Sequence, residues 1–225
     1  MTVSDQGVTR TDSAFQRLRS DILNGRLAQG SPLRLTTLAR ELSVSMSVVR
    51  EALTRLTGYG LVTATPNQGF RVTALSPADL EDLTALRITL ECQAIAASIE
   101  NGGLQWEGSV LSAHHVLEQT AIPNGQLPSE DWIEAHAAFH DALVAGCGRP
   151  RLLALVRSLR DTSEVYRQWS GASTEQGRDV AGEHRRLMEL AIARETDEAV
   201  AALRAHIQCT TDILLERAAD EPHST

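Results

Sequence analysis

The segment PLRLTTLARELSVSMSVVREALTRLTGYGLVTATPNQGFRV, residues 32–72, places two short amphipathic stretches in front of two strand-like runs. Each stretch has apolar residues at helical spacing: Leu35, Leu38, Ala39 and Leu42 in the first, then Val49, Ala52, Leu53 and Leu56 in the second. Only the short break SVS, residues 43–45, separates them before Met46. Apolar residues at i, i+3, i+4 and i+7 predict amphipathic helices. Two such helices joined by a tight turn are typical of a helix-turn-helix.

A β-hairpin is expected directly after the second helix. Residues 61–65, LVTAT, and residues 70–74, FRVTA, have the composition of strands, and Pro66-Asn67-Gln68-Gly69 lies between them. Glycine can take the positive φ that a tight hairpin turn needs. The hairpin would form the wing of a winged helix-turn-helix.

One more helix is expected before this segment. Residues 13–26 have the apolar residues Phe15, Leu18 and Ile22 at helical spacing, and Gly25 lies near the end of the stretch. Three helices followed by a hairpin complete a winged helix-turn-helix domain. We place this domain at residues 12–74, after a terminal tail at residues 1–11.

The rest of the chain has helical patterns and no strand-like alternation. Ser76 as the N-cap and Pro77 in the first turn mark the start of its first helix. Helices are predicted at residues 77–101, 104–120, 129–145, 150–169, 174–193 and 196–219. The fold class is therefore expected to be mainly α, with the winged helix-turn-helix followed by an antiparallel all-α bundle of about six helices. The bundle would span residues 75–219, and residues 220–225 would form a tail.

Charge is distributed unevenly between the two parts. Residues 1–74 hold nine Arg and five Asp or Glu, which gives +4, whereas residues 75–225 hold twelve Arg and twenty-four Asp or Glu, which gives −12. A basic module attached to an acidic body favours nucleic acid as the partner of the first part.

Cysteine usage and hydropathy exclude several classes of protein. Cys92, Cys147 and Cys209 are far apart and form no CxxC pair, which argues against a disulfide scaffold or a thiolate zinc site. The chain has no long apolar run and its N-terminus lacks the core of a signal peptide. We therefore expect a cytoplasmic protein with no membrane partner.

Residues 32–72 resemble the DNA-binding domain of GntR-type bacterial transcription regulators. The similarity rests on VREAL, followed by GLV, and on the PNQG turn of the wing. The resemblance implies that Arg34 and Arg50 contact phosphates or guanines and that Ser45 and Ser47, at the helix start, bind phosphate. Two further residues would form the wing tip. The residues assigned to DNA in this way are Arg34, Ser45, Ser47, Arg50, Gln68 and Gly69.

The chain also departs from the family pattern. Met46 stands where the family commonly has an arginine that touches DNA, and Val48 replaces a proline. Loss of this arginine predicts a different base preference or weaker binding. Met46 could instead cap the turn hydrophobically with no role in DNA binding. Arg50 could simply pair with Glu51 or Asp21 on the surface.

Four of the seven histidines supply the second candidate site. His136 and His140, in HAAFH, are four residues apart, so both would lie on one face of a helix. His184 and His206 lie on two further predicted helices, each beside an apolar stripe. Spacing alone does not show that the three helices converge. Isolated histidines of this kind are more often surface or core-edge residues.

This second part resembles the FCD ligand-binding domain that follows the winged helix in FadR-like GntR regulators. The matching stretches are LSPADLEDLTALRITLECQAI, FHDALVAGCGRPRLLAL, EHRRLMELAIARE and AVAALRAHI. Many such domains hold a divalent metal at the centre of the bundle. The resemblance assigns His140, His184 and His206 to three of the four ligand positions.

His136 stands where the family has an aspartate. Imidazole binds the same metals and lies at the right helical offset, so His136 could be a substitute ligand, or it could have left the site. Four neutral imidazoles would leave a divalent ion its full charge, whereas an aspartate would neutralise half of it. This donor set favours zinc, with nickel, cobalt or copper as alternatives, over manganese or calcium.

Arg87, in LRITLE, matches an arginine that points into the cavity of related domains. We expect its planar guanidinium group to bind the carboxylate of a small organic acid. The alternative is an ordinary salt bridge to Glu91, four residues later.

These features together predict a ligand-responsive transcription regulator, with repression as the family's commonest outcome. It would bind a palindromic DNA operator as a homodimer and respond to a small carboxylate effector. One alternative is a DNA-binding dimer without metal or effector. A metal-dependent hydrolase is the other, but it needs a general base such as the Glu of HExxH, and HAAFH has alanines there. We therefore do not expect an enzyme.

Overall fold

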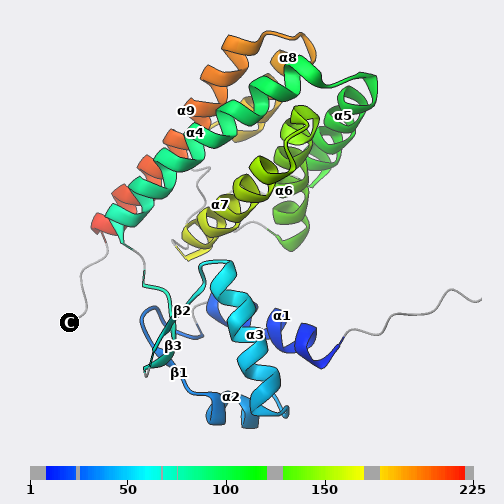
Figure 1. The fold of residues 1–225 in the computed structure, drawn as a ribbon. Helices are drawn as coiled ribbons and strands as arrows, with labels where there is room; N and C mark the ends of the chain where they lie inside the picture. Colours follow the sequence, from blue (N-terminus) through cyan, green and yellow to red (C-terminus); the bar gives the residue numbers. More distant parts are fainter. Residues whose placement is uncertain are drawn as a thin grey trace, which may run out of the picture. The chain divides into compact units, whose positions relative to one another are not determined.

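The structure is a computed structural model, which describes residues 9–23, 26–66, 68–74, 76–120, 129–169 and 178–220. The chain divides into two compact units, Met1–Ser76 and Pro77–Thr225, which are considered separately below (Figure 1). Nine α-helices and one three-stranded sheet make up the described part of the chain. None of the described helices has both the length and the apolar character that crossing a membrane would require.

The first unit has a helical core and a small sheet. Its elements are α1 (Arg10–Leu23), β1 (Pro32–Leu33), α2 (Leu35–Glu41), α3 (Met46–Gly58), β2 (Val62–Thr65) and β3 (Gly69–Val72). α3 packs against both α1 and α2. The apolar residues that predicted α1 and α3 are buried: Phe15, Leu18, Ile22, Val49, Ala52, Leu53 and Leu56. The predicted winged helix-turn-helix is therefore confirmed.

The bounds of α1 differ from the predicted helix over residues 13–26. The helix begins three residues earlier because the Thr9 hydroxyl accepts a hydrogen bond from the backbone N–H of Asp12 at 3.0 Å, an interaction that starts a helix. Part of the predicted N-terminal tail is thus helical. Gly25, expected near the end of this helix, lies outside the described residues.

The wing is a three-stranded sheet, whereas the sequence predicted only its hairpin. β2 and β3 pair antiparallel, and β1 adds to the other edge of β3 with Leu33 opposite Phe70. A strand of two residues is too short to show an alternating pattern. Gly69 has a φ of 80°, the left-handed value expected for the turn, while Asn67 lies outside the described residues.

The second unit is all-helical, as predicted. Its elements are α4 (Pro77–Asn101), α5 (Leu104–Gln119), α6 (Glu130–Val144), the short 3-10 helix η1 (Ala145–Cys147), α7 (Pro150–Trp169), α8 (Val180–Ile192) and α9 (Thr196–Asp220). All but α8 have bounds within one residue of the prediction. α8 begins at Val180 instead of residue 174, because the Asp179 side chain caps it by accepting from the N–H of Gly182 at 2.8 Å. The predicted breakers Ile122-Pro123-Asn124-Gly125 and Gly171 lie outside the described residues, as do 174–177 and 221–225.

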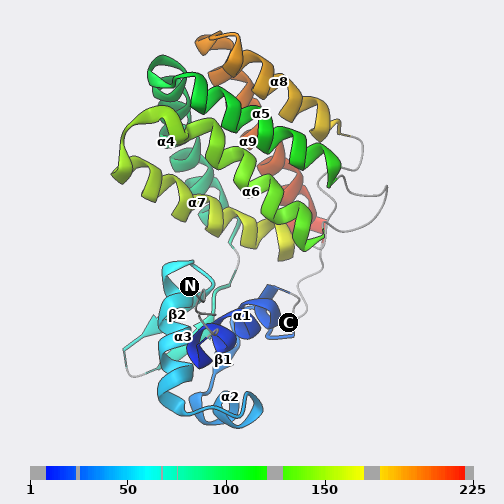
Figure 2. The ribbon, with the colours of Figure 1, turned by 90° about the vertical axis from the view of Figure 1, so that its right-hand side faces the viewer.

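α4 is the helix around which this unit is built. It packs on α6, α7, η1 and α9, and Figure 1 shows α4 and α9 side by side. α5 runs next to α6 in Figure 2. The core between them is apolar and includes the fully buried Ile95, Phe139, Leu187 and Leu203. Polar side chains inside such a core need partners, since burying an unpartnered polar group costs free energy.

Candidate metal centre and nucleic-acid interface

Three helices bring four histidines together inside the second unit. His136 and His140 come from α6, His184 from α8 and His206 from α9, and one ring nitrogen of each lies within 4.8 Å of the others. The ring centroids are between 4.6 Å and 6.5 Å apart. All are buried except His136, which is partly buried. The convergence that spacing alone could not show is therefore present.

The separation of these nitrogens suits one divalent ion. A first-row ion binds imidazole nitrogen at about 2.0–2.1 Å, so two ligands on one ion are at most about 4.2 Å apart. The four nitrogens lie within 4.8 Å of one another, so binding one ion would need the widest pair to approach by about 0.6 Å. The Nε2 atoms of His136 and His140 are already 3.2 Å apart. Nε2 of His184 is buried with no hydrogen-bond partner in the described part of the chain, and a metal ion would satisfy it.

The cluster is uncharged at neutral pH, which is the state that metal binding needs. Burial lowers the pKa of all four imidazoles, and it is the largest effect on each of them. Positive charge on neighbouring arginines lowers these pKa values further. Each neutral ring therefore offers one nitrogen lone pair and carries no positive charge that would repel a cation.

Glu183 orients one of these rings. Its Oε2 accepts a hydrogen bond from Nδ1 of His206 at 2.7 Å, and Arg178 donates to both of its carboxylate oxygens at 2.5 and 2.6 Å. Burial would raise the pKa of Glu183, but the hydrogen bonds from His206 and Arg178 lower it to about 2. The charged carboxylate keeps the proton on Nδ1 and leaves the lone pair on Nε2. This pairing is usual behind a histidine that binds a metal.

Trp132 and Arg167 hold the ring of His136. The Trp132 indole, one turn earlier on α6, stacks on the imidazole with centroids 4.6 Å apart and planes 13° from parallel. Arg167 of α7 covers the same indole at 4.7 Å and is also bound to Glu164. The ring of His136 therefore lies in the cluster and not away from it.

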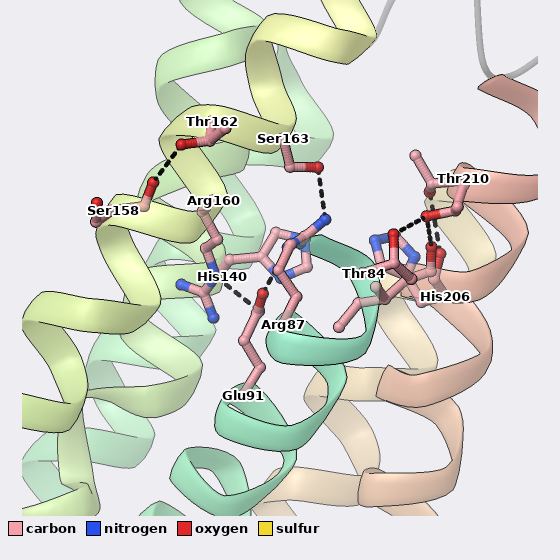
Figure 3. Close-up of polar contacts among 12 residues, drawn as sticks. Thr84, Arg87, Glu91, His140, Ser158, Arg160, Thr162, Ser163, His206 and Thr210 are labelled. Carbon is pink, nitrogen blue, oxygen red and sulfur yellow. Dashed lines mark hydrogen bonds and ion pairs between the residues drawn. The ribbon is translucent and has the colours of Figure 1, made fainter. Parts of the chain in front are cut away.

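A buried carboxylate lies between two arginines near the histidines (Figure 3). Glu91 of α4 has a side chain 0% exposed, and it accepts from Nε of Arg87 at 2.8 Å and from Nε of Arg160 at 2.7 Å. Burial would raise the pKa of Glu91, but the two arginines outweigh it and hold the pKa below its ordinary value. Arg87 also donates from Nη1 to Ser163 at 2.7 Å. The salt bridge left open as the alternative for Arg87 is therefore present.

The two arginines place positive charge beside the cluster. Arg160 lowers the pKa of His136 and His140, and Arg87 lowers that of His206. Nη2 of Arg160 is buried and has no hydrogen-bond partner among the residues described. Arg160 also donates from Nη1 to Asp141 at 3.2 Å, and Asp141 pairs with Arg157. Three guanidinium groups thus share two carboxylates, which leaves one net positive charge that attracts an anion.

The sequence alone does not identify the residues that surround the histidines. Two of them carry a usable signal, because Glu183 directly precedes His184 and Trp132 lies one helical turn before His136. Arg160 carries none, since it comes from another helix and no periodicity links it to the cluster.

In the first unit, a hollow of about 560 Å³ adjoins the starts of α2 and α3 and the tip of the wing. Its lining includes Arg34, Met46, Arg50, Gln68, Gly69 and Arg71. The structure thus brings four of the six residues assigned to DNA to one concave surface. Arg71, which the sequence did not assign to DNA, adds a further positive charge to this surface. Its Nη1 donates to the carbonyl of Gly30 at 2.7 Å.

The two serines assigned to DNA begin α3. Ser45 is the N-cap, and its hydroxyl accepts from the N–H of Val48 at 3.4 Å. Oγ of Ser45 also lies 2.8 Å from Oγ of Ser47, so the two hydroxyls are hydrogen-bonded to each other. Both residues are exposed.

The surface partners considered for Arg50 are engaged elsewhere. Asp21 pairs with Arg17 and Arg26, and Glu51 accepts from the Thr11 hydroxyl at 3.3 Å. Neither residue forms an ion pair with Arg50 among the described contacts, and the Arg50 side chain is exposed beside the hollow.

Two family models match the chain over most of its length. Residues 10–72 match the bacterial regulatory proteins of the gntR family, and residues 82–208 match the FCD domain. The chain belongs to the GntR family. This GntR regulator is a DNA-binding transcription regulator with an FCD domain, and the expectation that it is not an enzyme is confirmed.

Individual relatives agree with this assignment. The HTH-type transcriptional regulator BphR of Paraburkholderia xenovorans LB400 is 35% identical over 206 residues, which cover 90% of this chain and 84% of the relative. The HTH-type transcriptional repressor GlaR of Escherichia coli K12 is 31% identical over 198 residues, which cover 86% and 90%. The solved structure of E. coli McbR/YncC superposes with a TM-score of 0.72 over 94% of this chain and 99% of that chain, at 22% identity, and thus shares the fold.

Proposed function

We propose that this GntR regulator senses a small organic acid at a metal ion held by His136, His140, His184 and His206. The observation that carries the proposal is the convergence of four uncharged imidazole nitrogens within 4.8 Å of one another, in a chain that also has a DNA-binding domain. When bound, the ion would supply a Lewis-acidic position for an oxygen ligand.

Zinc is the metal that we propose, with nickel or cobalt as alternatives. Four imidazoles leave the ion its full charge, and nitrogen donors favour these metals over manganese or calcium. His136 supports this choice because the stacked Trp132 holds its ring beside that of His140.

Arg87 and Arg160 are the residues proposed to attract the acid. A guanidinium N–H forms a charge-assisted hydrogen bond with a carboxylate oxygen. Nη2 of Arg160 is buried without a partner in the described structure, whereas its Nη1 already donates to Asp141. Glu91 holds both arginines in place through their Nε atoms. The effector class is therefore a small carboxylate.

Control of transcription would follow from a change in domain arrangement. We propose a homodimer in which each subunit places one α3 in a half-site of a palindromic operator. An effector that binds one arrangement of the domains better than another shifts the population toward it and changes operator affinity. GlaR is named a repressor, and repression is the outcome proposed for this regulator too.

A thermal-shift experiment on the full-length protein tests the sensor. Zinc should raise the unfolding temperature, and small carboxylic acids should raise it further only while the metal is present. A ligand at about 100 times its Kd adds about 2.7 kcal/mol of stability, which corresponds to about 5–10 °C for a domain of this size. Matching amides serve as the uncharged control. An equal shift from the acids after treatment with a chelator would disprove metal-linked sensing.

Arg50→Ala tests the proposed DNA interface. The substitution should weaken binding to a duplex that the full-length protein selects from a random pool, and should lower the slope of log affinity against log salt by about 0.9, because one phosphate contact is lost. Arg17→Ala is the matched control, since this exposed arginine of α1 does not line the hollow. Unchanged affinity and slope for Arg50→Ala would remove Arg50 from the interface.

A further inference from the structure

Met46 is an exposed apolar side chain at the edge of the proposed DNA-binding hollow. It is the first residue of α3, directly after the N-cap Ser45, and its exposed fraction is 53%. It lines the hollow together with Arg34, Arg50 and Gln68. In helix-turn-helix proteins the first residues of the second helix are those that reach base edges.

Packing within the protein does not account for Met46. The apolar stripe that anchors α3 begins one turn later at Val49 and continues through Leu53 and Leu56, and these three side chains are fully buried. Met46 lies beyond the end of that stripe and faces solvent. The idea that it caps the turn hydrophobically would require a buried side chain, so the structure does not support it.

The hydroxyls on either side of Met46 are engaged locally. Ser45 and Ser47 hydrogen-bond to each other, and Ser45 also accepts from the N–H of Val48. Arg34 and Arg50 provide positive charge around the same hollow, which suits contacts with phosphate. Met46 thus adds a flexible apolar surface at a place where base edges are expected.

The chemistry of the major groove narrows what this surface can recognise. Base edges there present hydrogen-bond donors and acceptors, and the one apolar group among them is the C5-methyl of thymine. A methionine side chain is flexible and polarizable, so it adapts well to such a group. A guanine or cytosine edge would instead lose hydrogen-bonded water without gaining a polar partner.

We propose that Met46 contacts a thymine C5-methyl in each half-site and so determines the preference of this regulator for an A·T pair at that position. The proposal rests on the DNA interface proposed above. It makes Met46 a specificity-determining residue, while the neighbouring arginines supply affinity that is independent of sequence.

Deoxyuridine provides the test, because it differs from thymidine only in lacking the C5-methyl. Each thymine of a duplex selected by the full-length protein is replaced in turn by deoxyuridine, and binding is measured by fluorescence anisotropy. At one thymine per half-site the replacement should weaken wild-type binding about three- to fivefold, the loss expected for one buried methyl group. Met46→Ala should be insensitive to the same replacement, and Met46→Leu should keep part of the sensitivity.

Met46→Arg gives an independent readout. Arginine binds the O6 and N7 atoms of guanine, so a new selection with this variant should replace thymine by guanine at the same position. Because Met46 is exposed, these substitutions should leave the helical circular dichroism unchanged. A wild-type protein insensitive to deoxyuridine, or a loss of equal size in Met46→Ala, would overturn the proposal.

Arg50→Ala distinguishes failure of the DNA interface from failure of the role assigned to Met46. If this variant binds more weakly but the deoxyuridine effect does not depend on Met46, the interface stands and the role of Met46 is wrong. If Arg50→Ala binds the duplex as tightly as the wild type and no thymine position is sensitive to deoxyuridine, the interface is wrong and the assignment of Met46 falls with it.

Discussion

His184→Ala should sharply reduce metal binding in the second unit. His184 is buried at the centre of the cluster, and its Nε2 has no other partner in the described structure. Removing it takes away one of four nitrogen donors and leaves a void beside the remaining three. The metal content of the purified protein should fall well below that of the wild type, because three imidazoles hold the ion more weakly than four. Elemental analysis after gel filtration measures the change.

Two further substitutions make this result specific. His115→Ala is the matched control, because His115 is exposed on α5 and should keep its full metal content when replaced. Glu183→Gln should have an intermediate effect, weakening metal binding about 10–100-fold, since the charged carboxylate that orients His206 is lost while the ligands remain. Full occupancy in His184→Ala would show that the metal site is not at this cluster.

Glu91→Ala should strongly destabilise the second unit. It would leave Arg87 and Arg160, whose side chains are each 12% exposed, without the carboxylate between them. Removing one partner of a buried ion pair costs about 3–5 kcal/mol. All three tryptophans lie in this unit, at residues 106, 132 and 169. Their fluorescence during urea unfolding therefore reports the stability of this unit alone, and a chelator removes any contribution from metal.

The matched control for this variant is Glu118→Ala. Glu118 pairs with Arg185 across the more exposed surface between α5 and α8, with side chains 31% and 55% exposed. Such pairs contribute about 0–1 kcal/mol. If Glu91→Ala lowers the free energy of unfolding no more than Glu118→Ala does, the buried ion pairs of Glu91 do not have the stabilising role assigned to them.

The effect of Glu91→Ala should also depend on pH. The pKa of Glu91 in the folded protein is below the ordinary value of 4.5, so the folded state favours the charged carboxylate. The resulting stabilisation is complete above about pH 4.5 and is lost as the pH falls toward the lowered pKa. The difference in unfolding free energy between wild type and variant should therefore shrink in acid. A difference that stays constant would be the contrary result.

Helices were the most predictable part of this molecule. Apolar residues at helical spacing along α3, from Val49 to Leu56, mark the side that becomes buried, and the same holds for α1. The ends of elements were less predictable where a side chain decides them. Thr9 starts α1 early and Asp179 starts α8 late, because each accepts a hydrogen bond from a backbone N–H that would otherwise be unpaired.

The candidate sites depended on more than local pattern. The resemblance to the GntR and FCD families marked the histidines and the residues of the hollow, but their surroundings come from distant parts of the chain. Arg160 reaches Glu91 across 69 positions of sequence, and Trp132 meets Arg167 from another helix. The spacing of apolar residues along one helix does not predict such pairings between helices.

The sequence by itself determined the order and type of the helices, because the spacing of apolar residues decides which face of each helix is buried. It also determined the membership of the chain in the GntR family, through motifs that are continuous along it. Only the tertiary structure decided that His136 lies in the cluster, that Arg87 is bound to Glu91 and that Met46 stays exposed. These outcomes depend on how α4, α6, α7, α8 and α9 pack, and on where the core beneath α3 ends. Packing depends on contacts between residues far apart in the chain, which local spacing does not contain.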